Sequence, residues 1–218
     1  MEENNYCTLY VVRHGETEWN TNQNYVIMGQ MDSPLTPLGV EQVKATAEAL
    51  KNVHFDAIFS SDSPRAQRTA EIIRLDRELA VQTSELLRER KYGHFEGGPS
   101  AEYYAAVQHL LEEKKRLAEH EQWKFRLSED MESDEELVDR FFVQLREIAV
   151  SYPGKTVLVA THGGCIRTFL MRTDPANYKM WLGSHFPNAG YLRVLSDGVD
   201  FFLKDIVGMK KEATQKTQ

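Results

Sequence analysis

Basic side chains recur where three apolar segments of this sequence end. Arg13 and His14 follow the run Leu-Tyr-Val-Val, Arg65 lies just after the run that ends in Ser-Ser, and His162 follows Val-Ala-Thr. In an open α/β sheet, the carboxyl ends of the parallel strands share one edge, where ligands bind. We therefore expect these two arginines and two histidines to converge at one site.

A converging group of cations predicts an anionic ligand. Burying several positive charges together costs several kcal/mol unless an anion compensates them, and the planar guanidinium of arginine matches a phosphate in a bidentate manner. The whole chain carries a net charge of -7, which argues against a nucleic-acid partner. The sequence thus predicts a local basic pocket that takes a phosphoryl group.

Two histidines in such a pocket allow two chemical roles. A neutral imidazole, oriented through its other ring nitrogen, can attack phosphorus. A protonated imidazole can join the arginines in stabilising the negative charge of the transition state. Because these cations supply the charge that magnesium supplies in other phosphoryl-transfer enzymes, we expect no metal and no cofactor.

A proton donor is also required, because the departing alkoxide is a strong base. Glu89 is flanked by Arg88 and Arg90 at the end of an extended run, and Glu85 and Glu96 fit the spacing equally well. The charge pattern alone does not decide which of the three carboxylates is the proton donor.

Strand-like and helix-like segments alternate along the first two thirds of the chain. Short runs rich in Val, Ile, Phe, Tyr and Leu predict strands at residues 8–12, 56–60, 156–160, 191–195 and 201–207. The alternation predicts an α/β fold of three layers, with a mostly parallel central sheet. Asp197-Gly198, between the last two runs, is typical of a hairpin turn.

Three helices have clear start signals. Thr36-Pro37 opens an amphipathic segment over residues 36–52, and Ser63-Pro64 repeats the signal before Arg65. Ser133 and Glu136 form a capping box at the start of a helix over residues 133–152.

The charged segment 97–132 has a different character. It predicts a helix over about 100–120 followed by a polar connector, and we interpret it as a helical insertion, or lid, over the active-site edge of the sheet. We expect one domain over residues 1–218, of which 209–218 form a tail.

Composition excludes several classes of protein. The N-terminus lacks the basic and apolar regions of a secretory signal, and no apolar run is long enough to span a membrane. Cys7 and Cys165 lie in or beside apolar segments, so we expect buried free thiols rather than a disulfide. These features predict a cytoplasmic protein with no membrane partner.

Four motifs, RHGETEWN, SSDSPRAQRTA, LLRERKYGHFEG and VATHGG, occur in this order. Together they resemble the histidine phosphatase superfamily, also called phosphoglycerate mutase-like, from about residue 8 to residue 195. The resemblance implies a metal-independent phosphomonoester hydrolase that forms a phosphohistidine. It also implies roles for individual residues: His14 as the nucleophile, Glu89 as the proton donor, and a phosphate pocket made of Arg13, Asn20, Arg65, His162 and the backbone N–H of Gly163.

Departures from the family pattern bear on the substrate. Members with mutase activity carry paired arginines in a longer insertion, and no such pair occurs between residues 97 and 133, which favours hydrolysis. Met131-Glu132-Ser133 stands where many of the phosphatases have Gly-Glu-Ser, and RERKYG is similar to fructose-2,6-bisphosphatase-type members. The expected substrate is a sugar phosphate, a sugar acid phosphate or a nucleotide. We expect the protein to be a monomer or a homodimer.

Three other functions compete with this one: a mutase-type phosphoryl transferase, a pseudo-phosphatase or scaffold that binds a phosphorylated partner through the charged helix, and a metallohydrolase. The last is disfavoured because Arg13 and Arg65 would repel a cation. Among the remaining histidines, His94 and His185 could line the substrate entrance, but the sequence favours ordinary exposed loop positions for both. We expect the others, His54, His109 and His120, on the surface.

Overall fold

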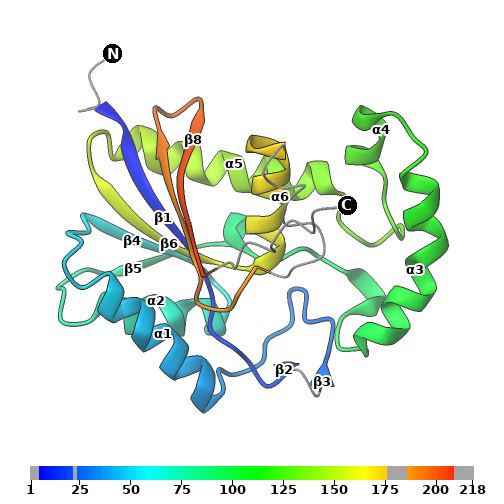
Figure 1. Ribbon diagram of the computed structural model, residues 1–218, viewed down its shortest axis with the longest axis horizontal. Helices are drawn as coiled ribbons and strands as arrows, with labels where there is room; N and C mark the ends of the chain where they lie inside the picture. Colours follow the sequence, from blue (N-terminus) through cyan, green and yellow to red (C-terminus); the bar gives the residue numbers. More distant parts are fainter. Residues whose placement is uncertain (1–4, 22–23, 176–185, 209–218) are drawn as a thin grey trace, which may run out of the picture.

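The computed structural model describes residues 5–21, 24–175 and 186–208. Its centre is a six-stranded sheet with helices on both faces (Figure 1). The strand order is β5-β4-β6-β1-β7-β8. The bounds are β1 Cys7–Arg13, β4 Ala57–Ser61, β5 Val81–Ser84, β6 Thr156–Thr161, β7 Tyr191–Ser196 and β8 Phe201–Val207.

The sheet is mostly parallel, as predicted. β1 pairs in parallel with β6, and β4 pairs in parallel with both β6 and β5. β7 pairs antiparallel with β1 and with β8, which follows it through the predicted turn at Asp197-Gly198. Every residue of β6 after Thr156 is buried, because helices cover both faces of a central parallel strand. The sequence between its two terminal threonines is accordingly apolar.

Two pairs of helices form the outer layers. α1 (Pro37–Ala49) and α2 (Pro64–Arg74) pack on one face, and α5 (Asp134–Ser151) and α6 (Gly163–Thr173) pack on the other. The predicted caps at Thr36 and at Ser133 with Glu136 are confirmed by their side-chain hydrogen bonds. The first helix is shorter than predicted, and Ser63 starts α2 without a capping bond.

Several short elements were not predicted. β5 is an edge strand with the polar sequence Val-Gln-Thr-Ser, so it lacks the apolar pattern of the central strands. β2 (Asn20–Thr21) and β3 (Asn24–Tyr25) form a separate two-stranded ribbon. The 3₁₀ turns η2 (Glu85–Leu87) and η3 (Gly93–Phe95) flank the segment that contains Glu89.

Segment 97–132 holds two helices, so the prediction of one helix to residue 120 is wrong. α3 (Ser100–Lys114) ends in a turn, and most of α4 (Glu119–Lys124) lies beyond residue 120, where we predicted a connector. Buried Trp123 anchors α4, with the guanidinium of Arg172 stacked 4.9 Å from its ring centroid.

This segment has a small core of its own, which we call the satellite cluster: Ile27, Tyr103, Val107 and Met131. Its start is tied to Ile27 by two backbone hydrogen bonds, of 2.9 Å from the Ile27 N–H to the Gly98 carbonyl and of 2.8 Å from the Gly97 N–H to the Ile27 carbonyl. The satellite cluster therefore joins 97–132 to the chain that follows β3. That this segment is an insertion, or lid, over the active-site edge stays a prediction.

Cys7 and Cys165 are free and buried, as expected. Across residues 5–21, 24–175 and 186–208, no helix combines the length and the apolar character needed to cross a bilayer.

Candidate active site

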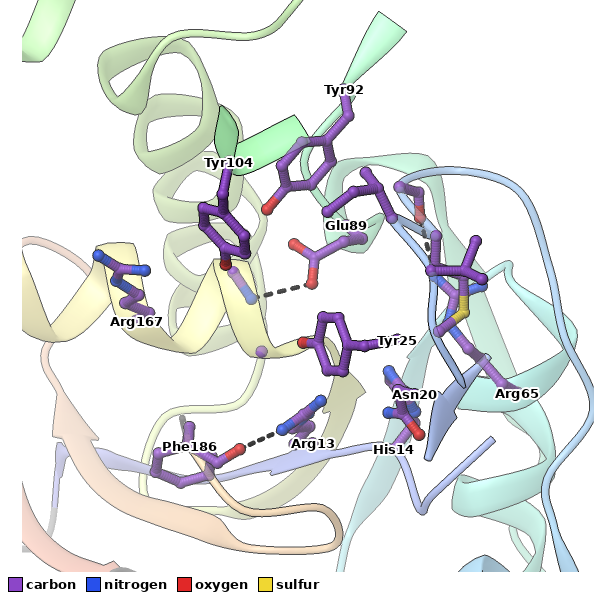
Figure 2. Close-up of a pocket in the computed structure, with 16 residues that line it drawn as sticks. Arg13, His14, Asn20, Tyr25, Arg65, Glu89, Tyr92, Tyr104, Arg167 and Phe186 are labelled. Carbon is purple, nitrogen blue, oxygen red and sulfur yellow. Dashed lines mark hydrogen bonds between the residues drawn. The ribbon is translucent and has the colours of Figure 1, made fainter. Parts of the chain in front are cut away.

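A pocket opens at the carboxyl edge of the sheet, beyond the ends of β1, β4 and β6 (Figure 2). It lies where the sequence predicted that the basic residues converge. The predicted site residues that line it are Arg13, His14, Asn20, Arg65, Glu89 and Gly163.

His14 follows the last residue of β1, and its backbone N–H donates to the carbonyl of Thr161 on the neighbouring strand at 3.0 Å. Its Nδ1 lies 2.8 Å from the carbonyl oxygen of Gly15. A carbonyl only accepts, so Nδ1 must carry the hydrogen and Nε2 the lone pair. Burial, with the charges of Arg65 and Arg13, holds the pKa of His14 well below its ordinary value. The ring is therefore neutral at neutral pH.

His162 occupies the N-cap of α6, and its ring centroid lies 5.3 Å from that of His14. It is fully buried and is not among the residues that line the pocket. Burial first, then the charge of Arg65, lowers the pKa of His162 well below its ordinary value. A protonated second histidine was expected, but the cost of desolvating an imidazolium beside two arginines keeps this ring neutral here.

Arg13 and Arg65 are 8% and 1% exposed. Arg13 donates to the carbonyl of Phe186 and hydrogen-bonds Tyr25. Arg65 donates to Asp32 Oδ1 at 2.9 Å and to two backbone carbonyls. Burial lowers the pKa of both guanidinium groups, although an arginine side chain stays charged at neutral pH. These contacts fix the direction of each cation.

Several buried donors at this site find no hydrogen-bond acceptor among the described residues. They are Nε of Arg13, Nε of Arg65 and Nδ2 of Asn20, and both ring nitrogens of His162 are equally unpartnered. The Oδ1 of Asn20 accepts from the Thr17 N–H at 2.7 Å, which orients the amide. Buried polar atoms normally have partners, so a cluster of unpartnered donors suits an oxyanion.

Glu89 lies across the pocket from Arg13 and His14 in Figure 2. Its Oε2 accepts from the Gly164 N–H at 2.9 Å, at the start of α6, and its Oε1 accepts from the Arg90 N–H at 2.7 Å. A Cβ on Gly164 would lie 2.1 Å from Glu89 Oε1, so only glycine allows this approach.

The rival carboxylates lie elsewhere. Glu85 is exposed and pairs with Arg88 at 3.1 Å, and Glu96 accepts from the Tyr92 N–H at 2.8 Å. Neither lines the pocket. Gly163 does, and the side chain that it lacks would lie 3.1 Å from Arg13 Nε.

Ten further residues of the pocket were missed in the sequence, and four of them have polar side chains: Tyr25, Tyr92, Tyr104 and Arg167. We call these four residues the rim. We call Arg13, His14 and Arg65, together with the buried His162 beside His14, the floor. Tyr25 ends β3 of the short ribbon, Tyr104 lies on α3 and Arg167 lies on α6. No motif or spacing links them, because they come from four separate parts of the chain.

The other histidines that the structure describes lie outside the pocket. His94, His54, His109 and His120 are exposed, and His94 contacts Asp130 rather than the pocket. His185 lies outside the described residues. Over the described ranges, no group of three or more His, Cys, Asp or Glu side chains could hold a metal ion.

Comparison with known proteins identifies the family. Residues 9–207 match the model of the histidine phosphatase superfamily, branch 1. The chain is 36% identical to "Uncharacterized phosphatase PhoE" of Bacillus subtilis (strain 168) over 160 residues, covering 73% of this chain and 74% of that protein. It is 33% identical to "Phosphoglycerate mutase-like protein 4" of Arabidopsis thaliana over 181 residues, covering 82% and 76%.

A solved structure, that of phosphoglycerate mutase from Bacillus anthracis str. Sterne, superimposes with a TM-score of 0.81 at 28% identity, over 93% of each chain. The resemblance seen in the four motifs is thus confirmed over the full extent of the sheet. The chain belongs to the histidine phosphatase superfamily, branch 1.

Proposed function

We propose that this protein is a metal-independent phosphomonoesterase that acts on a small phosphorylated metabolite through a phosphohistidine. The observation that carries this proposal is the orientation of His14. The Nδ1 hydrogen bond to Gly15 leaves the lone pair on Nε2, in a pocket with unpartnered donors from Arg13, Arg65 and Asn20. A neutral nucleophile beside oriented cations is the arrangement that phosphoryl transfer needs.

In the first step, Nε2 of His14 attacks phosphorus, and the bond between phosphorus and the ester oxygen breaks. Glu89, in its protonated form, gives its proton to the departing oxygen, so an alcohol leaves. Arg13, Arg65 and Asn20 bind the phosphoryl oxygens. The negative charge of that group also raises the pKa of the adjacent His162, which favours its protonated form during the reaction.

In the second step, water attacks phosphorus while the Glu89 carboxylate accepts its proton. The bond between phosphorus and Nε2 breaks, inorganic phosphate forms and neutral His14 returns. Glu89 is again protonated, so the cycle closes without any other reactant.

Hydrolysis is favoured over mutase chemistry by the lining of the pocket. Arg116 and Arg126 are the arginines of segment 97–132, and neither lines it; Arg126 instead pairs with Glu136. The Bacillus subtilis relative is named a phosphatase. Metabolites that fit are sugar phosphates, sugar acid phosphates and nucleotides. The buried free thiols Cys7 and Cys165 support a cytoplasmic location.

The test is hydrolysis of p-nitrophenyl phosphate in excess chelator by the wild type, His14→Ala and His54→Ala. His54 is the matched control, because its side chain is 89% exposed. We expect turnover by the wild type and His54→Ala, and a loss of about 10⁴-fold or more in His14→Ala, as for other nucleophile deletions. A folded His14→Ala variant that keeps its activity would refute the mechanism.

A further inference from the structure

The backbone that leads into Glu89 is held by side chains. Arg140 on α5 donates from Nη1 to the carbonyls of Leu86 and Arg88 at 2.8 and 2.7 Å, and from Nη2 to the carbonyl of Glu89 at 3.0 Å. The remaining carbonyl, that of Leu87, accepts from Thr161 Oγ1 at 2.9 Å. One guanidinium therefore fixes most of this turn.

Arg140 is fixed in its turn by Glu132. Nε of Arg140 lies 2.6 Å from Glu132 Oε1, and Nη2 lies 2.9 Å from Oε2. The two side chains are 17% and 12% exposed. A bidentate pair of this kind sets the plane of the guanidinium as well as its position.

Glu132 also binds the chain on the far side of Glu89. Its backbone N–H donates to the Lys91 carbonyl at 2.9 Å, its Oε2 accepts from the Lys91 N–H at 3.2 Å, and its carbonyl accepts from Arg90 Nη1 at 2.9 Å. The Arg140–Glu132 pair thus holds the backbone both before and after the proton donor.

We propose that Arg140 and Glu132 are positioning residues that hold the Glu89 carboxylate at the leaving-group side of the pocket. This inference rests on the proposed function, because it assigns these residues to the proton-donor step. Displacing a reacting group by about 1 Å can cost about 100-fold in rate. The hydrogen bonds of the pair described above go to the turn that contains Glu89. The charge of Arg140 also lowers the pKa of His162, so the test must keep that charge and change only the hydrogen bonds.

Substitution at Arg140 should leave the fold intact. The core-facing side of α5 is apolar and consists of Leu137, Phe141, Leu145 and Ile148, whereas Arg140 faces a polar groove with Glu132 and Lys91. Lysine keeps the charge but has one ammonium group, which cannot span three carbonyls and a carboxylate. Arg140→Lys is therefore a test of geometry.

The experiment compares glycerol phosphate, whose alkoxide needs a proton donor, with p-nitrophenyl phosphate, whose aryl oxide needs little help. For Arg140→Lys and Glu132→Gln we expect kcat to fall by about 100-fold on the alkyl ester and by no more than about threefold on the aryl ester, with KM unchanged on both. Arg146→Lys is the matched control. Arg146 lies on the same helix but donates to the Val199 carbonyl, and its replacement should change neither value.

A double variant separates positioning from a structural role. In a Glu89→Gln background, Arg140→Lys should cause no further loss on the alkyl ester, because its effect passes through the missing acid. An equal loss on both esters, or a further loss in that background, would overturn the proposal.

Amide hydrogen exchange tests the same point without turnover. The N–H groups of Arg90 and Gly164 donate to Glu89, so both should exchange faster in Arg140→Lys and at the wild-type rate in Arg146→Lys. Unchanged protection in Arg140→Lys would overturn the positioning role. A wild type that hydrolyses neither ester would instead overturn the proposed function, and the exchange result would still decide the role of Arg140.

Discussion

The floor and the rim of the pocket are built in different ways. Floor residues stand at the ends of sheet strands or in the first turn of the helix that follows, and Arg65 and His162 are 1% and 0% exposed. Rim residues come from a ribbon, a loop and two helices, and Tyr104 and Tyr25 are 47% and 36% exposed. Under the proposed function, the ends of the sheet strands would fix the phosphoryl chemistry, while the region of segment 97–132 would shape the space for the leaving group.

Glu89 lies between these two regions. Its substitution is expected to have the largest effect on hydrolysis among the changes that distinguish them. Glu89→Gln should slow hydrolysis of alkyl phosphates by about 10²–10⁴-fold, the usual contribution of a general acid. It should slow hydrolysis of p-nitrophenyl phosphate far less, because an aryl oxide leaves without a proton. The measurement is kcat/KM on both esters.

Glu85→Gln is the matched control, since Glu85 belongs to the same segment but has a 76% exposed side chain. It should resemble the wild type on both esters. Equal losses on the two esters in Glu89→Gln would mean that the acid is misassigned.

The buried floor should also be visible in the pH dependence of stability. The pKa values of His14 and His162 are held well below the ordinary value in the folded protein, while both histidines titrate near pH 6.5 when unfolded. As pH falls below about 6.5, the unfolded chain binds protons that the folded chain does not, so each histidine lowers stability by about 1.4 kcal/mol per pH unit.

Urea unfolding between pH 7 and pH 5 measures this slope. His162→Asn should reduce the pH dependence of the free energy of unfolding by the contribution of one histidine. His54→Gln, at an 89% exposed position, should not change it. An unchanged slope in His162→Asn would contradict the neutral, buried state of this ring.

Substitutions in the rim should affect substrate choice more than the chemical step. Among the three predictions made here for Glu89, the buried histidines and the rim, we expect this effect to be the smallest. Arg167→Ala and Tyr104→Ala remove side chains at the pocket mouth, so we expect about tenfold changes in the relative kcat/KM values of phosphorylated metabolites, with kcat for p-nitrophenyl phosphate little changed. Competition assays with pairs of metabolites measure the ratio.

Arg172→Ala is the control for Arg167→Ala, because Arg172 lies on the same helix and stacks on Trp123 away from the pocket. An equal change in the ratio of kcat/KM values in both variants, or no change in either, would show that the rim does not select the leaving group.

The same division explains what the sequence could predict. β1 and β6 are buried on both faces and read as apolar runs, so their ends, with Arg13, His14 and His162, were located by pattern alone. Glu89 could not be separated from Glu85 and Glu96 by charge pattern, because its contact with Gly164 links residues 75 positions apart. The motif resemblance supplied that choice.

Other features were beyond local patterns. β5 is polar and was missed, since the strand is defined by its pairing with β4 rather than by an apolar face. The rim depends on the satellite cluster, in which Ile27 meets Tyr103 and Val107 across a long stretch of chain. The neutral state of His162 follows from its burial beside the arginines, which spacing does not reveal.

The central claim is that the reaction passes through a phosphohistidine at His14. Mass spectrometry of the wild type, quenched under alkaline conditions during turnover of p-nitrophenyl phosphate, tests this directly. We predict one acid-labile phosphoryl group on the peptide that contains His14, and none on His14→Ala. Turnover with no phosphorylated protein, or with the phosphoryl group on another residue, would contradict the account.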